Sequence, residues 1–343
     1  MAHLSLAPLI ALTRRKQVNS YYQGPESDHF DGTHFFNPGK RWNKNRGDLM
    51  KWWREGGREE WPALHPSPFH DKPPARVTGA AIRLSYIGHA SFLLQVAGLN
   101  LLIDPVWSER ASPFASFGPK RVNAPGITLD DLPPIDAVLI SHNHYDHLDL
   151  ATLRAINRKH RPLFITPLGN DAIIKLIGDN PRIITRDWGE SVALNDDTQV
   201  FIEEAYHWSA RGLNDRHHAL WGAFVIRTSA GVIYAIGDTG FHSGQIFSDV
   251  REKHGPIRLA LIPIGAYEPR WFMAEQHMNP EEAVKAFMLS GAEQAVAHHW
   301  GTFQLTNEAL HRPPDDLQKA LQENAIAPEQ FLTLRPGEVL TCP

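Results

Sequence analysis

The sequence predicts an α/β fold in which strands are stacked in layers and helices cover the outside. From residue 80 onward, short apolar or alternating runs typical of strands interleave with runs that have helical spacing. Several of the strand-like runs are followed within a few residues by histidine or aspartate, and the mixed order of strands and helices is typical of strands stacked in layers with helices outside. The length of 343 residues allows one large domain or two ordinary ones.

The N-terminal part differs from the rest of the chain in composition and in hydrophobic periodicity. Residues 18–76 are rich in aromatic residues, Gly, Pro and charge, with little sustained periodicity. We expect an irregular N-terminal extension, residues 1–76, packed on a main domain of residues 77–343. Within the extension, the apolar segment Leu4–Leu12 is too short to span a bilayer and lacks the features of a secretory signal. It is either a stretch that touches a membrane surface or a partner, or a loosely packed arm.

The main domain begins with strands that hairpins connect. The expected strands are Ile82–Ile87, Phe92–Val96, Leu99–Ile103, Ala137–Ile140, Phe164–Thr166, Ile183–Thr185, Val200–Glu204, Ala223–Thr228, Val232–Ile236, Leu259–Ile262 and Ala295–Ala297. The expected helices are Leu150–His160, Asn170–Ile177, Pro280–Leu289 and Leu317–Asn324. Asp149 and Asn279 precede two of these helices as candidate N-caps, and Pro280 suits a first helical position.

The composition is that of an ordinary globular enzyme and excludes several classes of protein. Lys plus Arg (34) and Asp plus Glu (38) nearly balance at a net charge of −4, so we expect no nucleic-acid partner. The single cysteine, Cys342, rules out an intramolecular disulfide and fits a reducing cytoplasm. The 19 histidines are the unusual feature, because they gather in short clusters.

The most informative run is Ser141–Asp149, which directly follows the strand Ala137–Ile140. It holds four candidate metal ligands: His142, His144, Asp146 and His147. An extended backbone would point the first three the same way and the fourth elsewhere. Because imidazole and carboxylate suit zinc and its neighbours, the run predicts a metal site at a strand end, with room for two ions. A histidine loop used only for capping and hydrogen bonding is the competing interpretation.

Further ligands must follow other strands, since a catalytic zinc needs three protein ligands and a two-metal centre needs more. Three strand ends carry candidates: His207, Asp238 and the pair His298–His299. Taken alone, each of these histidines can be explained as an ordinary core or surface residue, and the aspartate as a turn residue. Adjacent side chains on an extended segment face opposite ways, so only one member of the histidine pair can be a ligand.

The complete pattern resembles the metallo-β-lactamase superfamily. Within it, several runs resemble the N-acylphosphatidylethanolamine-hydrolysing phospholipases D: Gly237–Gly240, Pro263–Met273, Gln276–His277, Pro280–Ala283 and His299–Phe303. The resemblance extends over about residues 80–335. It implies a four-layer αββα sandwich of the metallo-β-lactamase type. It also implies a zinc-dependent phosphodiester hydrolase of the phospholipase D type that acts on N-acylphosphatidylethanolamine-like lipids, with metal-bound hydroxide as nucleophile.

The resemblance also implies roles for individual residues. His142, His144 and His207 would hold one zinc ion; Asp146, His147 and His299 would hold a second; Asp238 would bridge them. The Trp300–Gly301 pair fits His299 to the family pattern. Asp146, Asp238 and His277 form the candidate catalytic set, with His277 orienting the phosphate. Tyr267, Arg270 and Trp271 are the candidate substrate contacts, Arg270 being the expected anion contact.

Three further residues are expected to lie around the metal ligands. Asp104 and Asp149 are candidates to hydrogen-bond the ligand imidazoles, and His89 would lie near the mouth of the site.

The expected partners are a phospholipid or other phosphodiester substrate and a peripheral contact with a membrane surface, and a homodimer is compatible with the sequence. A metal-dependent lactonase, a soluble-phosphodiester hydrolase and a metal-stabilised binding module are the alternatives. The Trp52–Trp53 pair is either part of a lipid-facing surface or packed in the core.

Overall fold

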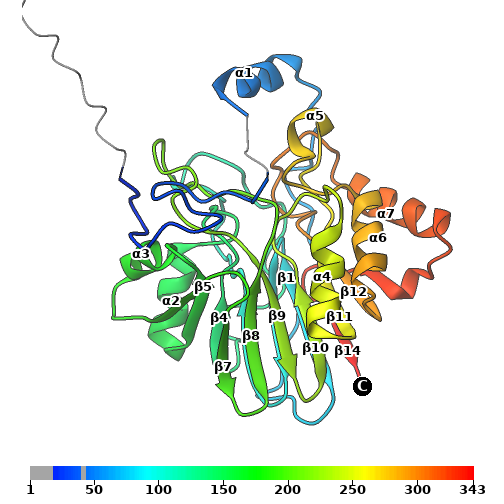
Figure 1. Ribbon diagram of the computed structural model, residues 1–343. Helices are drawn as coiled ribbons and strands as arrows, with labels where there is room; N and C mark the ends of the chain where they lie inside the picture. Colours follow the sequence, from blue (N-terminus) through cyan, green and yellow to red (C-terminus); the bar gives the residue numbers. More distant parts are fainter. Residues whose placement is uncertain (1–17, 40–43) are drawn as a thin grey trace, which may run out of the picture.

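Two seven-stranded sheets stack face to face with helices on both outer faces (Figure 1). The computed structural model describes residues 18–39 and 44–343. The segment Leu4–Leu12, with the role considered for it, lies outside these residues. The architecture confirms the four-layer αββα sandwich expected from the sequence.

The first sheet has the order β14-β1-β2-β3-β4-β5-β6. Its strands are β1 (Ile82–Gly88), β2 (Ser91–Val96), β3 (Leu99–Ile103), β4 (Ala137–Leu139), β5 (Leu163–Pro167), β6 (Arg182–Arg186) and β14 (Val339–Cys342). Strands β14 to β3 pair antiparallel, and β3 to β6 pair parallel. Its outer face is covered by α2 (Leu150–His160), α3 (Asp171–Ile174) and the 3₁₀ turn η1 (Lys175–Ile177).

The second sheet has the order β13-β12-β11-β10-β9-β8-β7. Its strands are β7 (Ser191–Asn195), β8 (Thr198–Glu203), β9 (Ala223–Thr228), β10 (Gly231–Ala235), β11 (Ile257–Pro263), β12 (Gln294–His298) and β13 (Phe331–Thr333). Its outer face is covered by α4 (Gln245–His254), α6 (Pro280–Ser290) and α7 (Arg312–Glu323), and η2 (Pro328–Gln330) precedes β13. Strands β8, β10, β11 and β12 run in the same direction, so their carboxyl ends meet at one edge.

The alternation of side chains along the strands separates the cores. In β3, Leu101 and Ile103 face the second sheet, whereas Leu102 packs beneath α2 with Leu153. This is the period of two that a strand buried on both faces requires. The central core therefore lies between the sheets, and a second and a third core lie under the helices on either side.

The described part of the N-terminal extension is irregular apart from one helix, α1 (Arg46–Glu55), which the sequence did not predict. Asn45 caps this helix by accepting hydrogen bonds from the amides of Gly47 and Asp48. Helix α1 lies at one end of the sandwich beside the short helix α5 (Arg270–Met273) (Figure 1). Among the residues that the structure describes, no helix is long and apolar enough to cross a membrane.

Candidate metal centre

The ligand loop after β4 is turned, not extended. The amides of His147 and Leu148 both donate to the carbonyl oxygen of His144, at 3.1 and 2.8 Å. The turn places Asp146 with His147 and not with His142 and His144, which corrects the orientation expected for an extended backbone. The loop therefore offers two imidazoles to one group of donors and a carboxylate with an imidazole to another.

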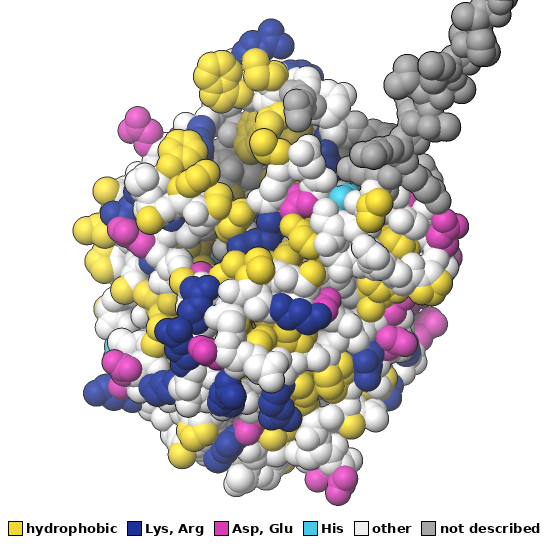
Figure 2. Space-filling view, turned by 90° about the vertical axis from the view of Figure 1, so that its left-hand side faces the viewer, with side chains coloured by type: hydrophobic (Ala, Val, Ile, Leu, Met, Phe, Trp, Pro, Cys, Tyr) yellow, Lys and Arg dark blue, Asp and Glu magenta, His cyan; other side chains and the backbone are white. Residues whose placement is uncertain are grey.

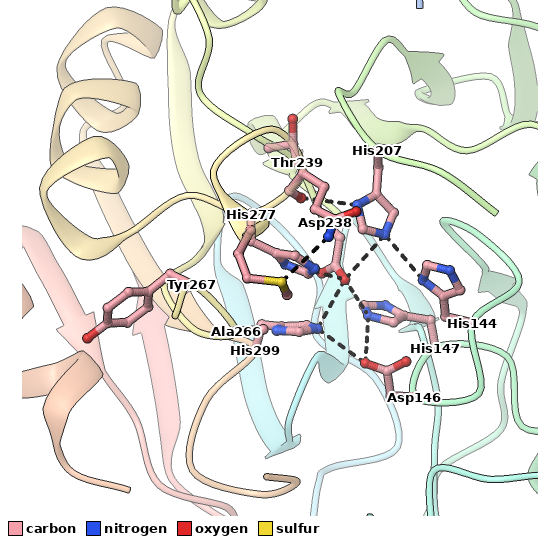
Figure 3. Close-up of polar contacts among 12 residues, drawn as sticks. His144, Asp146, His147, His207, Asp238, Thr239, Ala266, Tyr267, His277 and His299 are labelled. Atoms are coloured by element: carbon pink, nitrogen blue, oxygen red, sulfur yellow. Dashed lines mark hydrogen bonds and ion pairs between the residues drawn. The ribbon is translucent and has the colours of Figure 1, made fainter. Parts of the chain in front are cut away.

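Strand ends far apart in sequence complete these groups (Figure 3). Within each group, one donor atom per residue lies within 4.8 Å of all the others. The groups are His142, His144, His207 and Asp238; His89, Asp146, His147 and His299; and Asp238, His277 and His299. All of these residues are buried except His144, which is half-buried. The seven residues predicted as ligands thus converge on one place.

Asp238, in the turn after β10, lies at the centre. Its Oδ2 is 3.1 Å from His299 Nε2, 3.3 Å from His147 Nε2, 3.7 Å from His207 Nε2, and 3.9 Å from both His142 Nε2 and His277 Nδ1. The preceding Gly237 permits this approach, because a Cβ there would lie 2.9 Å from the Ser141 Cβ of the ligand loop. One buried carboxylate oxygen therefore faces five imidazole nitrogens.

Hydrogen bonds behind the imidazoles fix which nitrogen faces the centre. His147 Nδ1 lies 2.7 Å from Asp104 Oδ2, and His207 Nδ1 lies 3.1 Å from the carbonyl oxygen of Gln276. Both oxygens can only accept, so each Nδ1 carries the hydrogen, and each ring in its neutral form would present the Nε2 lone pair to the centre. Asp104 also accepts from Ser141 Oγ, which lies 2.9 Å from His142 Nδ1. Asp104 thus has the supporting position expected for it.

The donor spacing and chemistry fit a bound cation. His144 Nδ1 lies 2.9 Å from His142 Nε2 and 3.2 Å from His207 Nε2. Two nitrogens at about 2.0–2.1 Å from a tetrahedral zinc are about 3.3 Å apart, so this spacing suits one ion. In the described part of the chain, Asp238 Oδ1 is buried without a hydrogen-bond partner. Buried polar atoms without partners are costly unless a ligand satisfies them.

The electrostatics also favour a cation. Burial lowers the pKa of His207 to about 3 and of His144 to about 4, which keeps both rings neutral and able to coordinate. Burial alone would raise the pKa of Asp238, but the neighbouring imidazoles, His147 first, hold it well below its usual range. Burial also opposes charge on His299, yet Asp238 and Asp146 raise its pKa to about 9. The carboxylates therefore create a field that attracts positive charge.

The structure distinguishes between His298 and His299. His298 Nε2 lies 2.8 Å from the carbonyl oxygen of Ile236, away from the cluster. His299 Nε2 lies 3.1 Å from Asp238 Oδ2 and 3.2 Å from Asp146 Oδ2. The two neighbouring side chains face opposite ways, and His299 is the one that the fold brings to the centre.

Two of the predicted substrate contacts, Tyr267 and Trp271, are turned away. Tyr267 is buried, and its hydroxyl donates to Asp316 Oδ2 at 2.7 Å, on the side remote from the cluster (Figure 3). Trp271 lies on the surface, where its Nε1 donates to Glu55 Oε2 at 2.9 Å. The structure therefore corrects both expectations: the first residue anchors a loop to α7, and the second contacts α1.

Arg270 is not placed as an anion contact either. Its Nη1 donates to the carbonyl oxygen of His277 at 2.9 Å, and its Nη2 pairs with Glu282 Oε2 at 2.7 Å. The guanidinium thus fixes the turn that carries His277 into α6. This bonding corrects the expected role, because the carboxylate already compensates the cation.

A cavity of about 410 Å³ opens beside the donors. One part of its wall consists of the donor residues His144, Asp146, Asp238, His277 and His299. Another part is apolar and consists of Leu49, Trp52, Phe272, Met273 and Leu305. Two cationic side chains, Lys44 and Arg216, also line the cavity. The sequence did not point to either cation. Of the Trp52–Trp53 pair, only the first lines the cavity, and the second is 78% exposed, so a core role for the second is wrong.

His89 is closer to the donors than the sequence suggested. It is buried, and its Nε2 lies 2.9 Å from Asp146 Oδ2. Its ring also lies 4.3 Å from that of His299, centroid to centroid. Asp149, by contrast, caps α2 through the amide of Ala151 and supports no ligand imidazole.

Comparisons with known proteins agree with this geometry. A family model described as Beta-lactamase superfamily domain matches residues 99–300. N-acyl-phosphatidylethanolamine-hydrolyzing phospholipase D 1 of Caenorhabditis elegans is 38% identical over 266 residues, covering 74% of this chain and 74% of the relative. The mitochondrial N-acyl-phosphatidylethanolamine-hydrolyzing phospholipase D of Saccharomyces cerevisiae is 31% identical over 240 residues, covering 68% of this chain and 50% of the relative.

Solved structures share the fold at lower identity. A novel metallo hydrolase of the archaeon Ignicoccus hospitalis is 22% identical with a TM-score of 0.56, covering 77% of this chain and 99% of that chain. At this identity the likeness shows the fold alone. The family model matches more than half of the chain, and the nematode relative matches about three quarters of it. The chain therefore belongs to the β-lactamase superfamily and is a metal-dependent hydrolase of the metallo-β-lactamase fold.

Proposed function

We propose that this protein is a zinc-dependent phosphodiester hydrolase of the phospholipase D type that acts on N-acylphosphatidylethanolamine-like lipids. The observation that carries the proposal is Asp238, which five imidazole nitrogens surround at the end of a cavity with apolar walls. A polar reaction centre next to an apolar cavity suits a lipid phosphodiester. The printed names of the nematode and yeast relatives support the same substrate class.

The donors divide between two ions. His142, His144 and His207 would hold one zinc ion, Asp146, His147 and His299 the other, and Asp238 would contribute to both. When bound, the two ions would lower the pKa of a water toward neutrality and neutralise negative charge on the phosphate oxygens. The buried position of the donors keeps these electrostatic interactions strong, because the local dielectric is low.

Other residues of the chain would bind and orient the substrate. His277 is buried at the cavity wall with its Nδ1 3.9 Å from Asp238 Oδ2, so its ring is placed to hydrogen-bond a phosphate oxygen. Lys44 and Arg216 line the same cavity and provide positive charge for the phosphodiester. Phe272 and Met273 are apolar parts of the same cavity wall and would exclude water from the reacting bond.

A lipid substrate also requires access to a membrane surface, and we propose a peripheral contact through α1. Leu49, Met50 and Trp53 of this helix are 53%, 55% and 78% exposed, and Leu49 also lines the cavity. Hydrophobic side chains project beside Lys and Arg at the upper end of the molecule in Figure 2, the end where α1 lies in Figure 1. An apolar face of this kind suits insertion into the headgroup region of a bilayer.

A substrate panel tests the proposal. Full-length protein with bound zinc is offered micellar N-acylphosphatidylethanolamine, a simple aryl phosphodiester and an acyl lactone. We expect release of N-acylethanolamine and phosphatidic acid from the lipid, with slower turnover of the aryl diester. Rapid hydrolysis of the lactone, or of the soluble diester without lipid turnover, would overturn the lipid assignment in favour of a lactonase or a soluble-phosphodiester hydrolase.

A further inference from the structure

Residues 44–61, which we call the arm, supply one wall of the cavity beside the metal centre. Leu49 and Trp52 of the arm line this cavity together with Phe272, Met273 and Leu305 of the main domain, and Trp52 packs directly against Phe272. The arm lies outside residues 99–300, the part of the chain that the family model matches.

Trp52 is held in a fixed position in the wall. Its ring centroid lies 5.0 Å from that of Phe272, and its Nε1 donates to Asn307 Oδ1 at 2.9 Å. Since the only polar atom of the side chain is already bonded, the rest of the indole offers an apolar surface. That surface suits a hydrocarbon chain and not a second polar group.

Both ends of the arm are tied to the main domain. Asn307 donates through Nδ2 to the carbonyl oxygen of Gly56 at 2.8 Å, and its own carbonyl oxygen accepts from the amide of Glu59 at 2.9 Å. At the other end, Lys44 Nζ donates to the carbonyl oxygen of Trp271 at 2.7 Å. These bonds hold the arm across the cavity at a fixed distance.

The turn at Asn307 and Glu308 anchors two walls at once. The Glu308 carboxylate accepts from the amides of Ala266 and Glu268 at 2.6 and 3.1 Å, and Ala266 lines the cavity. The Glu308 carbonyl oxygen accepts from Trp61 Nε1 of the arm at 2.9 Å. The width of the cavity is therefore set by one turn that holds both the arm and the facing loop.

We propose that the arm selects the hydrocarbon chain of the substrate and that Trp52 is the specificity-determining residue of this wall. The proposal rests on the proposed function, because it assigns the apolar part of a phosphodiester lipid to a named surface. The polar end of the ligand lies at the donors, and the chain extends along the apolar wall that Trp52 and Phe272 form together.

Binding of soluble ligands tests the proposal without membranes or turnover. Affinities of butyl, octyl and dodecyl phosphonate for full-length, zinc-loaded protein are measured by isothermal titration calorimetry. We expect affinity to rise with chain length in the unmodified protein. Trp52→Ala should weaken dodecyl phosphonate by about 10- to 50-fold, the loss of contact with two or three methylenes, and butyl phosphonate by less than about threefold.

Matched variants separate this effect from damage to the helix. Arg54→Ala changes an exposed side chain of the same helix that does not line this cavity, and should leave all three affinities unchanged. Trp52→Phe keeps an aromatic ring packed against Phe272 and should retain most of the chain-length dependence. Asn307→Ala removes the bonds to the arm and should reduce that dependence while leaving the butyl affinity within about threefold.

Each outcome decides the proposal. Equal weakening for all three chain lengths in Trp52→Ala, or the same loss in Arg54→Ala, would overturn it. Failure of the proposed function gives a different pattern: the chain-length dependence would still depend on Trp52, but N-acylphosphatidylethanolamine would not be hydrolysed. If lipid is hydrolysed and Trp52→Ala leaves the dependence intact, the function stands and the arm does not select the chain.

Discussion

Replacing Asp104 by Asn would test whether hydrogen bonds behind the donors hold the centre together. Asp104 is buried, its Oδ1 accepts from the amide of Ser141 at 2.7 Å, and its Oδ2 accepts from Ser141 Oγ and His147 Nδ1 at 2.6 and 2.7 Å. Whichever way the Asn amide is rotated, its NH₂ group faces a hydrogen-bond donor. Asn tolerates the positive φ of 39° at this position, so backbone strain does not contribute.

The magnitude follows from these three bonds. Hydrogen bonds to a charged group contribute about 1.5–3 kcal/mol each, so losing one or two should lower the free energy of unfolding by about 3 kcal/mol. The entropy of unfolding scales with length, so for 343 residues each kcal/mol shifts Tm by about 1.4 °C, and Tm should fall by about 4 °C. Loss of a partner behind a ligand imidazole weakens metal binding by about 10- to 100-fold, so zinc affinity should fall by that factor.

Competition for zinc with a chromophoric chelator, followed by thermal melts of the metal-free protein, measures both effects. Asp149→Asn is the matched control, because Asp149 is also buried and accepts from the Ser108 amide and the Thr152 hydroxyl. None of its bonds reaches an imidazole, so the control should lower Tm and leave zinc affinity unchanged. Zinc affinity of Asp104→Asn equal to that of the unmodified protein would refute the reasoning.

Three further predictions follow. Asp238→Asn removes the charge that five imidazole nitrogens face. Metal analysis should therefore find one zinc ion or fewer per chain, and diester turnover should fall by at least about 100-fold. Two tightly held ions would contradict this prediction. His89→Ala removes the bond to Asp146 and should weaken one of two zinc sites by about 10-fold in a chelator titration, whereas equal weakening of both sites would argue for general damage. Burial lowers the pKa of His29, but bonding to carboxylates, Asp187 first, raises it above the ordinary value. The protonated ring therefore stabilises the fold below about pH 6.5 and loses this contribution as pH rises through the raised pKa, so melts of His29→Gln should differ from the unmodified protein more at about pH 5.5 than at about pH 9. A difference that stays constant with pH would rule out this linkage.

The positions of the donors could be predicted because their signal is local. His207, Asp238 and His299 each follow an apolar run, and the carboxyl ends of strands that run in one direction meet at one edge of a sheet. The order of the elements and the cap at Asn279 could be predicted for the same reason: they depend on residues close in sequence.

The contacts of the cavity could not be predicted, because they depend on which segments the fold brings together. Tyr267 and Arg270 were candidates from a motif, but Asp316 and Glu282 lie nearer to their polar groups than the donors do. Trp52 belongs to a helix whose apolar side chains are partly exposed, so its contribution to the cavity leaves no periodic signal.

Strand β14 and helix α4 were not predicted, because no local sequence signal marks either element. Strand β14 has four residues near the C-terminus and pairs with β1, the first strand of the sandwich, so no local hairpin signal marks it. Helix α4 follows Gly244 without a side-chain cap, which removes the usual sign of a helix start.

The wide separation of the donors in sequence has a consequence for biosynthesis. The first group needs His207 and Asp238 from the second sheet, and the second group needs His299, which follows β12. A growing polypeptide therefore possesses neither donor set in complete form until most of the second sheet has left the ribosome. Ion capture would then be one of the last steps in the maturation of the newly made enzyme, after the two sheets have come together.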